Sequence, residues 1–189
     1  PKDGDNVWVF LALALLSQST THLDMAYAGT TAQLTEWDCA QACAATLLDW
    51  AELSPDPELW ADLIQPGQPI TFRHLQDYFA GCGVEAVGYR LSWEALTSFL
   101  HDNPGSPLLA HLGEGRGHFV LVVDAGPPGI LTADPAHGVH FTPASDFEET
   151  WSGVVLYFPQ LHQLPTALAA GEEAYGRTQI LTEASYMRP

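Results

Sequence analysis

The sequence has very little positive charge. Only 6 of its 189 residues are Lys or Arg, against 23 Asp or Glu, and the formal net charge is −17. A surface of this kind repels phosphate backbones and anionic lipids, so we expect neither a nucleic acid nor a membrane surface as a partner. A neutral or cationic partner, such as a basic peptide, fits the electrostatic field of this negatively charged chain better.

Long apolar runs and cysteines are also few. The longest run, residues 7–16, has ten apolar residues, whereas a transmembrane helix needs about 20, so no membrane span is predicted. Three Cys exclude a disulfide scaffold and leave at least one free thiol. With 47% hydrophobic residues, the chain has enough apolar surface for one globular domain with its own core.

Residues 1–28 form an extension before the main body. The apolar run 7–16 resembles the core of a signal peptide, and the Ala-Tyr-Ala at 26–28 resembles a cleavage site. The segment before the run is not positively charged, which speaks against a signal peptide. We therefore expect a packed N-terminal helix, with a signal peptide as the alternative. The chain is expected in the cytoplasm, or exported in the signal-peptide alternative.

Most predicted helices lie in the first half of the body and most predicted strands in the second half. Apolar periodicity and capping residues, among them Thr71 and Ser92, predict helices at 38–53, 58–64, 71–80 and 93–101. Short apolar runs between Gly and Pro clusters predict strands at 84–91, 108–112, 118–124, 129–133 and 153–158. Helices followed by strands indicate an α+β domain over residues 29–160, with a helical half packed on an antiparallel sheet. Residues 161–189 are expected to form a C-terminal arm.

Cys39 follows Asp38 at the start of the best-defined helix. Asp38 is expected to cap that helix. A thiol at a helix N-terminus experiences the positive end of the macrodipole and unpaired N–H groups, and both favour the nucleophilic thiolate. Cys39 is therefore the candidate nucleophile; the alternative is a small buried Cys in an Ala-rich helix.

His118 begins a strand after a Gly-rich loop, where it can reach a helix N-terminus and act as a general base. His111 competes for that role, but it lies inside an apolar run and should point into packing. Asp134 follows the strand 129–133, which should pair with the His118 strand. Asp134 is therefore expected near His118, where it can orient the imidazole; the alternatives are an ordinary paired His and an Asp-Pro turn.

Two residues beside Cys39 are candidates for binding the substrate. Gln33 lies six residues before Cys39 and can aim its amide N–H at a developing oxyanion, together with the backbone N–H of Cys39. Trp37 is a candidate wall of a substrate subsite.

The remaining Cys and His residues support no metal site. Cys39 and Cys43 are one helical turn apart but lack a second pair of ligands. Cys43 is expected in the core and Cys82 in a turn, and His137 and His140 are interpreted as part of a solvated loop. No metal or cofactor is expected.

Several segments in order resemble one family, the bacteriocin-processing cysteine peptidases, which are papain-like domains that cut leader peptides after a double-glycine-type site. The resemblance lies in Gln33 and the run 38–43, in 67–88, 107–111, 117–120 and 134–136, and in Phe147 with residues 151–153. It implies a papain-like fold and a peptidase with Cys39, His118, Asp134 and Gln33 as catalytic residues. It also implies a leader peptide as substrate.

The sequence departs from this family in two places. The family has Gly after the nucleophile, where this chain has Ala40. Family members are often fused to a transporter, but these 189 residues hold no Gly-x-x-x-x-Gly-Lys motif. We therefore expect a stand-alone peptidase that works with a separate export transporter. Two alternatives stay open: an acyltransferase with the same nucleophile, and a catalytically silent domain that binds a peptide.

Overall fold

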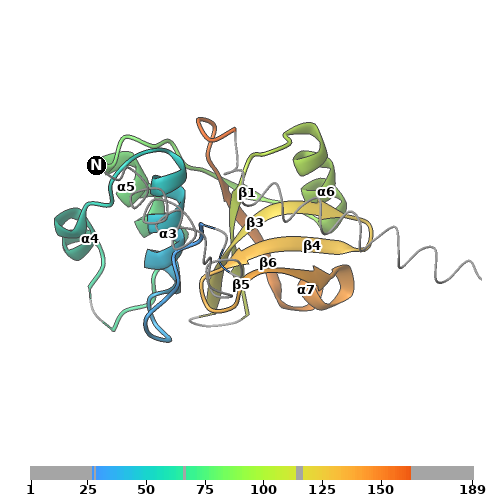
Figure 1. The fold of residues 1–189 in the computed structure, drawn as a ribbon, viewed down its shortest axis with the longest axis horizontal. Helices are drawn as coiled ribbons and strands as arrows, with labels where there is room; N and C mark the ends of the chain where they lie inside the picture. The colour runs from blue at the N-terminus through green and yellow to red at the C-terminus, as the bar shows by residue number, and fades with distance from the viewer. Residues whose placement is uncertain (1–26, 28, 66, 114–116, 163–189) are drawn as a thin grey trace, which may run out of the picture.

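An antiparallel sheet of six strands forms the centre of the computed structural model, which describes residues 27, 29–65, 67–113 and 117–162 (Figure 1). The spatial order is β1-β6-β2-β3-β4-β5, and each neighbouring pair is antiparallel. The strands are β1 (Val87–Arg90), β2 (Leu108–Leu112), β3 (His118–Gly126), β4 (Gly129–Asp134), β5 (Gly138–Pro143) and β6 (Trp151–Tyr157).

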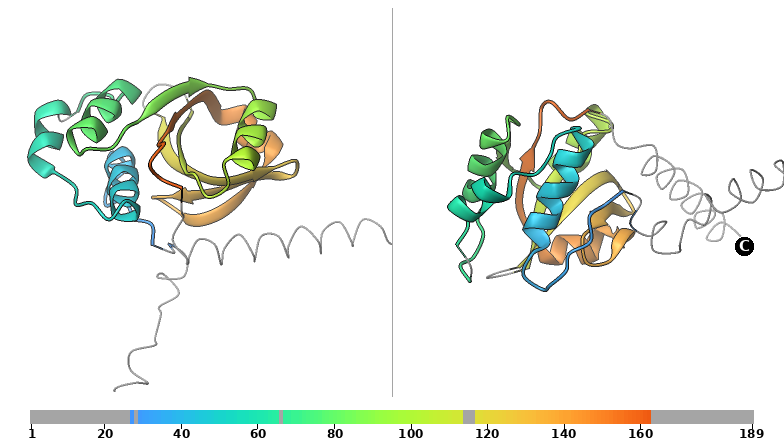
Figure 2. Two further views of the ribbon diagram at one scale, coloured as in Figure 1. Left: turned by 90° about the horizontal axis from the view of Figure 1, so that it is seen from above. Right: turned by 60° about the vertical axis from the view of Figure 1, so that its left-hand side comes forward.

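Helices cover both faces of this sheet (Figures 1 and 2). One face carries α3 (Cys39–Trp50), α4 (Pro57–Leu63) and α5 (Phe72–Gly81); the other carries α6 (Trp93–Asp102) and α7 (Ala144–Thr150). The predicted α+β class is confirmed, as is the packing of an N-terminal helical half on a C-terminal antiparallel sheet.

Strand β3 shows why its sequence is continuously apolar. Phe119, Leu121 and Val123 belong to the core cluster that includes α3 and α5. Val120 and Val122 belong to the cluster that includes α6 and α7. Because side chains alternate between faces, a strand covered on both sides must be apolar at every position.

Two of the predicted helix caps are present as hydrogen bonds. The Thr71 hydroxyl accepts from the backbone N–H of His74 at the start of α5 (3.2 Å). The Ser92 hydroxyl accepts from the N–H of Ala95 at the start of α6 (3.3 Å). Each satisfies one of the backbone donors that a helix N-terminus leaves unpaired.

Two elements were not predicted. Strand β5 forms an edge of the sheet and is buried only at its first residue, the others being partly or fully exposed, so it lacks the apolar run that marks a buried strand. Helix α7 has seven residues, no side-chain cap and one buried residue, Phe147, so it has too little periodicity to be recognised.

The predictions for the two ends of the chain lie outside the described residues. These are the packed helix or signal peptide in residues 1–28, of which 27 alone is described, and the arm at 161–189, described only at 161 and 162. In the part of the chain that the structure describes, no helix is long and apolar enough to cross a bilayer.

Candidate active site

Cys39 is the first residue of α3, and its thiol lies beside the start of β3. The residue is 7% exposed. The thiol interacts with the side chain of His118 and with the backbone of Phe119. One turn further along α3, the Cys43 thiol donates a hydrogen bond to the carbonyl oxygen of Phe119 (3.4 Å). The helix N-terminus and the start of β3 are thus held together at the candidate nucleophile.

Asp38 occupies the N-cap position of α3, but its carboxyl group makes no capping hydrogen bond. The expectation that it caps the helix is wrong in this respect. Its backbone (φ −107°, ψ 17°) is not in the extended conformation usual for a cap. The two carboxyl oxygens instead accept from the N–H groups of Leu34 (3.0 Å) and Thr35 (2.9 Å). Asp38 therefore closes the loop that leads into Cys39.

His118 and Asp134 are brought together by the hairpin of β3 and β4. His118 begins β3, Asp134 ends β4, and the two strands pair through Leu121 and Ala133, as the sequence predicted. The Nε2 atom of His118 lies 2.8 Å from Oδ1 of Asp134. The other ring nitrogen, Nδ1, is thereby left for the thiol of Cys39. The imidazole therefore stands between a thiol and a carboxyl group.

These contacts shift the pKa values of all three groups toward charged forms. Burial of the Cys39 thiol opposes ionisation, but the hydrogen bond from His118 and the backbone of Phe119 outweigh it, so the pKa of Cys39 is lowered. Burial also opposes a charged imidazole, yet hydrogen bonds to Asp134 and Cys39 raise the pKa of His118 to about 9. The pKa of Asp134 lies well below its usual range because hydrogen bonds from His118, Ala136 and His137 outweigh burial.

A second histidine contacts Asp134, and sequence reasoning missed it. The Nδ1 atom of His137 lies 3.1 Å from Oδ2 of Asp134, and the N–H of Ala136 donates to Oδ1 (2.7 Å). His137 was interpreted as part of a solvated loop, and its side chain is indeed 72% exposed. The signal available in the sequence was its spacing, three residues after an Asp that opens a turn.

Gln33 is attached to the same turn by its backbone. Its N–H donates to the carbonyl oxygen of Pro135 (2.8 Å). Its side-chain Oε1 is buried and has no hydrogen-bond partner among the described residues. A buried oxygen without a partner is costly, and Oε1 can accept a hydrogen bond from a ligand N–H. Donation to an oxyanion would come from the other amide atom, Nε2.

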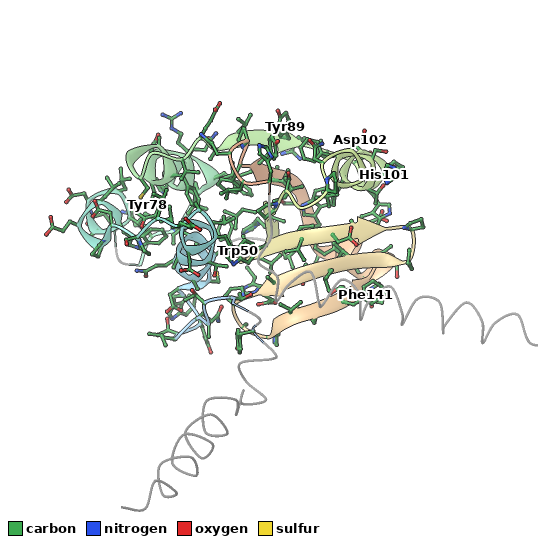
Figure 3. All side chains as sticks on the ribbon, turned by 45° about the horizontal axis from the view of Figure 1, so that its top comes forward. Trp50, Tyr78, Tyr89, His101, Asp102 and Phe141 are labelled. Carbon is green, nitrogen blue, oxygen red and sulfur yellow. The ribbon has the colours of Figure 1, made fainter. Side chains whose placement is uncertain are left out.

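A groove of about 520 Å³ opens beside Cys39. Its wall includes the rings of Trp37, which is 62% exposed, and Trp60. Trp60 packs edge-on against Tyr78 (4.9 Å between ring centroids), and Figure 3 shows Tyr78 within the helical half. The other lining residues are mostly apolar or amide-bearing, with two carboxylates among them: Glu36, Asp38, Ala40, Gln41, Ala61, Ile64, Gln65, Gly67, Gln68, Pro69, Ile70, Gly117 and Phe119.

His111, the competing candidate base, lies beside Gly117, the residue before His118. Its ring packs against Phe119 (4.8 Å between centroids) and Phe72 (6.3 Å). A Cβ added at Gly117 would collide with this ring. Of the two histidines, it is His118 that contacts both Cys39 and Asp134.

Within the described residues, no group of three His, Cys, Asp or Glu side chains is arranged to hold a metal ion. The groups gathered here can supply a nucleophilic thiolate, a proton donor and acceptor, and a carboxylate that orients it.

The antiparallel sheet, the helix that carries a Cys at its N-terminus and the Cys–His contact define a papain-like cysteine peptidase. The sequence profile of the peptidase C39 family matches residues 28–161, more than half of the chain. The chain therefore belongs to the peptidase C39 family and is a cysteine peptidase.

Several solved structures have a similar fold. A double glycine motif protease from an AMS/PCAT transporter, in complex with the leader peptide, is 22% identical (TM-score 0.58, covering 68% of this chain and 89% of that one). The peptidase domain of Streptococcus ComA, a bi-functional ABC transporter, is 16% identical (TM-score 0.58, 68% and 95%). The peptidase domain of Streptococcus mutans ComA is 17% identical (TM-score 0.52, 69% and 98%). Among curated proteins, no relative matches the chain.

Proposed function

We propose that this chain removes a leader from a precursor peptide, with Cys39 as nucleophile, His118 as general acid and base, and Asp134 as the group that orients His118. The observation that carries the proposal is the position of the His118 ring between the Cys39 thiol and the Asp134 carboxyl group. Membership of the peptidase C39 family supports the same reaction.

Acylation begins from the thiolate–imidazolium pair, which the pKa shifts of Cys39 and His118 favour. The sulfur attacks the carbonyl carbon of the scissile amide, and negative charge develops on the carbonyl oxygen. The backbone N–H of Cys39 and the side-chain amide of Gln33 are the proposed donors to that oxygen. His118 then gives its proton to the leaving nitrogen, the C–N bond breaks, and a thioester with Cys39 remains.

Deacylation uses the same residues in the opposite direction. His118, now neutral, takes a proton from a water molecule, and the oxygen of that water attacks the thioester carbonyl. The C–S bond breaks, the leader leaves with a new carboxyl group, and the thiolate–imidazolium pair is restored. Throughout, Asp134 holds the ring of His118 by its Nε2 atom, so Nδ1 stays directed at the sulfur.

The proposed substrate is a leader peptide with two small residues before the cut. One fold neighbour is described as a double glycine motif protease bound to its leader peptide, which supports this choice. Trp37 is the proposed wall of a subsite, because it lines the groove next to Cys39. Glu36 and Asp38 line the groove, and among the described residues no Lys or Arg does, which favours a leader that is cationic or neutral there.

The proposed partner of the peptidase is an export transporter. The fold neighbours come from transporters, one described as a bi-functional ABC transporter. Co-purification of the full chain with a candidate transporter tests this pairing; a complex that forms equally well with an unrelated transporter would contradict it.

Synthetic peptides test the reaction. The full chain is incubated with a peptide that carries Gly-Gly inside a leader-like sequence, with a second in which both Gly are Val, and with acidic and basic versions of the first. Mass spectrometry should show one cut after Gly-Gly, faster for the basic version at low salt, and none with Cys39→Ala. Transfer of the acyl group to an added amine without hydrolysis, or binding without reaction, would overturn the proposal.

A further inference from the structure

The carboxyl group of Asp134 contacts two imidazole rings, one at each of its oxygens. His118 contacts Oδ1 through Nε2 at 2.8 Å, and His137 contacts Oδ2 through Nδ1 at 3.1 Å. The mechanism described above uses the first contact only. The second comes from the turn that follows β4, three residues along the chain.

The burial of Asp134 gives the second contact its importance. The side chain of Asp134 is 6% exposed, and a buried carboxylate is stable only when donors replace the water it has lost. The donors from His118 and from the N–H of Ala136 both bind Oδ1. Oδ2 is held by His137. Without a donor on Oδ2, only one oxygen of the carboxyl group is held, so the group rotates more easily about its terminal bond and Oδ1 is less well aligned with the N–H of His118.

We propose that His137 is a positioning residue: its Nδ1–H fixes Oδ2 of Asp134 and so keeps Oδ1 aligned with the imidazole of His118. This inference rests on the proposed function, since it assigns to His118 and Asp134 the roles given there. A neutral ring in the Nδ1–H tautomer and a charged ring can both donate from Nδ1, so the contact forms in either protonation state.

The turn itself is held without the His137 side chain. The N–H of Gln33 donates to the carbonyl oxygen of Pro135 (2.8 Å), and the hydroxyl of Tyr27 donates to that of Ala136 (3.1 Å). Replacing the His137 side chain therefore leaves the path of the backbone supported.

Among the described residues, two ionisable side chains contact the ring of His137. Asp134 lies on β4 and makes the hydrogen bond described above. His140 lies on β5, with its ring centroid 5.9 Å from that of His137. His140 hydrogen-bonds to the backbone of Gly138 (3.2 Å) and makes a matched control, because it is a neighbouring imidazole that contacts His137 rather than Asp134.

Three variants of the full chain test the proposal. His137→Phe keeps a ring and removes the donor; His137→Asn keeps a donor, since the Asn amide nitrogen occupies nearly the place of Nδ1. His140→Phe is the control. The measurements are kcat and KM on the cleaved peptide across pH, and the pKa of the His118 ring by NMR titration, which needs no turnover.

His137→Phe should lower kcat roughly 5- to 20-fold, at the low end for a hydrogen bond to a charged group because the ring is largely exposed. KM should not change. The alkaline limb of the pH profile and the NMR pKa of His118 should both move below the wild-type position near 9, because the imidazolium loses its aligned partner. His137→Asn should restore kcat and the pKa of His118 most of the way to their wild-type values. His140→Phe should match the wild type.

Four results would overturn the inference: a His118 pKa that stays or rises in His137→Phe, an unchanged kcat, a failure of His137→Asn to recover, or an equal loss in His140→Phe. A wild-type chain that cuts no peptide would instead refute the proposed function, and the NMR titration would still decide whether His137 aligns Asp134.

Discussion

The Nε2 atom of His118 lies 2.8 Å from Oδ1 of Asp134, and the two residues are the first of β3 and the last of β4. One hairpin therefore builds the proposed acid–base pair. The proposed nucleophile, Cys39, lies outside this hairpin, on α3. It reaches His118 because α3 packs against β3 through Cys43 and Phe119. The site is completed where the helical half meets the sheet.

Cys39 is predicted to be the only catalytic thiol. Iodoacetamide should modify Cys39 at neutral pH well before Cys43, because burial raises the pKa of Cys43 well above its usual value, whereas the pKa of Cys39 is lowered despite burial. Cys39→Ala should abolish cleavage while the circular dichroism spectrum stays that of the wild type. Labelling is located by peptide mapping.

Cys82→Ser serves as the control for this experiment, because Cys82 lies outside the groove and is partly exposed. It should keep full activity and the labelling pattern at Cys39. Preferential labelling of Cys82, or cleavage by Cys39→Ala, would exclude Cys39 as the nucleophile.

The pH dependence of cleavage should follow the thiolate–imidazolium pair. The pair exists above the lowered pKa of Cys39 and below the raised pKa of His118, about 9. Activity should therefore fall as the pH rises through about 9, where His118 loses its proton, and fall again in acid, where Cys39 gains one. Asp134→Asn should move the alkaline limb to lower pH, since the imidazolium loses its negative partner.

Asp124→Asn is the matched control, because Asp124 lies on the same hairpin and hydrogen-bonds to the N–H of Ala125 (2.8 Å). Its pH profile should match the wild type. An alkaline limb that shifts equally in both variants would indicate a change in the hairpin and not the loss of a partner for His118.

The sequence was informative wherever the signal was local. The start of the Cys39 helix, the caps Thr71 and Ser92 and the buried strand β3 are each marked by a few consecutive residues. The pairing of β3 with β4 followed from the turn between them, and that pairing brought Asp134 to His118.

Features that depend on the folded turn could not be found in this way. The contact of His137 with Asp134 exists because the turn folds back on the carboxyl group; in sequence it is an ordinary polar turn. Asp38 occupies a cap position, but the backbone directs its carboxyl group into the preceding loop. The catalytic roles of Cys39, His118, Asp134 and Gln33 and the subsite role of Trp37 all stay predictions.

Gln33 is predicted to stabilise the oxyanion. Gln33→Ala should lower kcat by roughly 10²–10³, the usual effect of removing one oxyanion donor, with little change in KM. Gln33→Glu keeps the shape of the side chain but replaces the donor by an acceptor, so its kcat should be no higher than that of Gln33→Ala. The backbone bond of Gln33 to Pro135 is the same in every variant, which separates the side chain from the segment.

Gln41→Ala provides the comparison for Gln33, since Gln41 also lines the groove beside Cys39 but lies on the exposed side of α3. Its effect should stay within a few-fold. A loss of tenfold or less in Gln33→Ala, or a rise in KM with kcat retained, would make Gln33 structural.

Gly117 is predicted to be irreplaceable because it combines two constraints. Its φ of +52° is in the left-handed region, which costs a residue with a Cβ about 1–2 kcal/mol, and that Cβ would collide with the His111 ring and the carbonyl oxygen of Leu112. Gly113 has a similar φ of +77°, but a Cβ added there would have its nearest atom, the Cα of Gly117, 3.7 Å away. Urea unfolding should therefore show a larger loss of stability for Gly117→Ala than for Gly113→Ala. Of these two variants, only Gly117→Ala should lose activity, because the collision displaces His118.

Adding His111→Ala to Gly117→Ala should recover part of the lost stability, because it removes the ring that the new Cβ meets. Equal losses in the two glycine variants would show that backbone strain acts alone and that the ring of His111 does not set the position of His118.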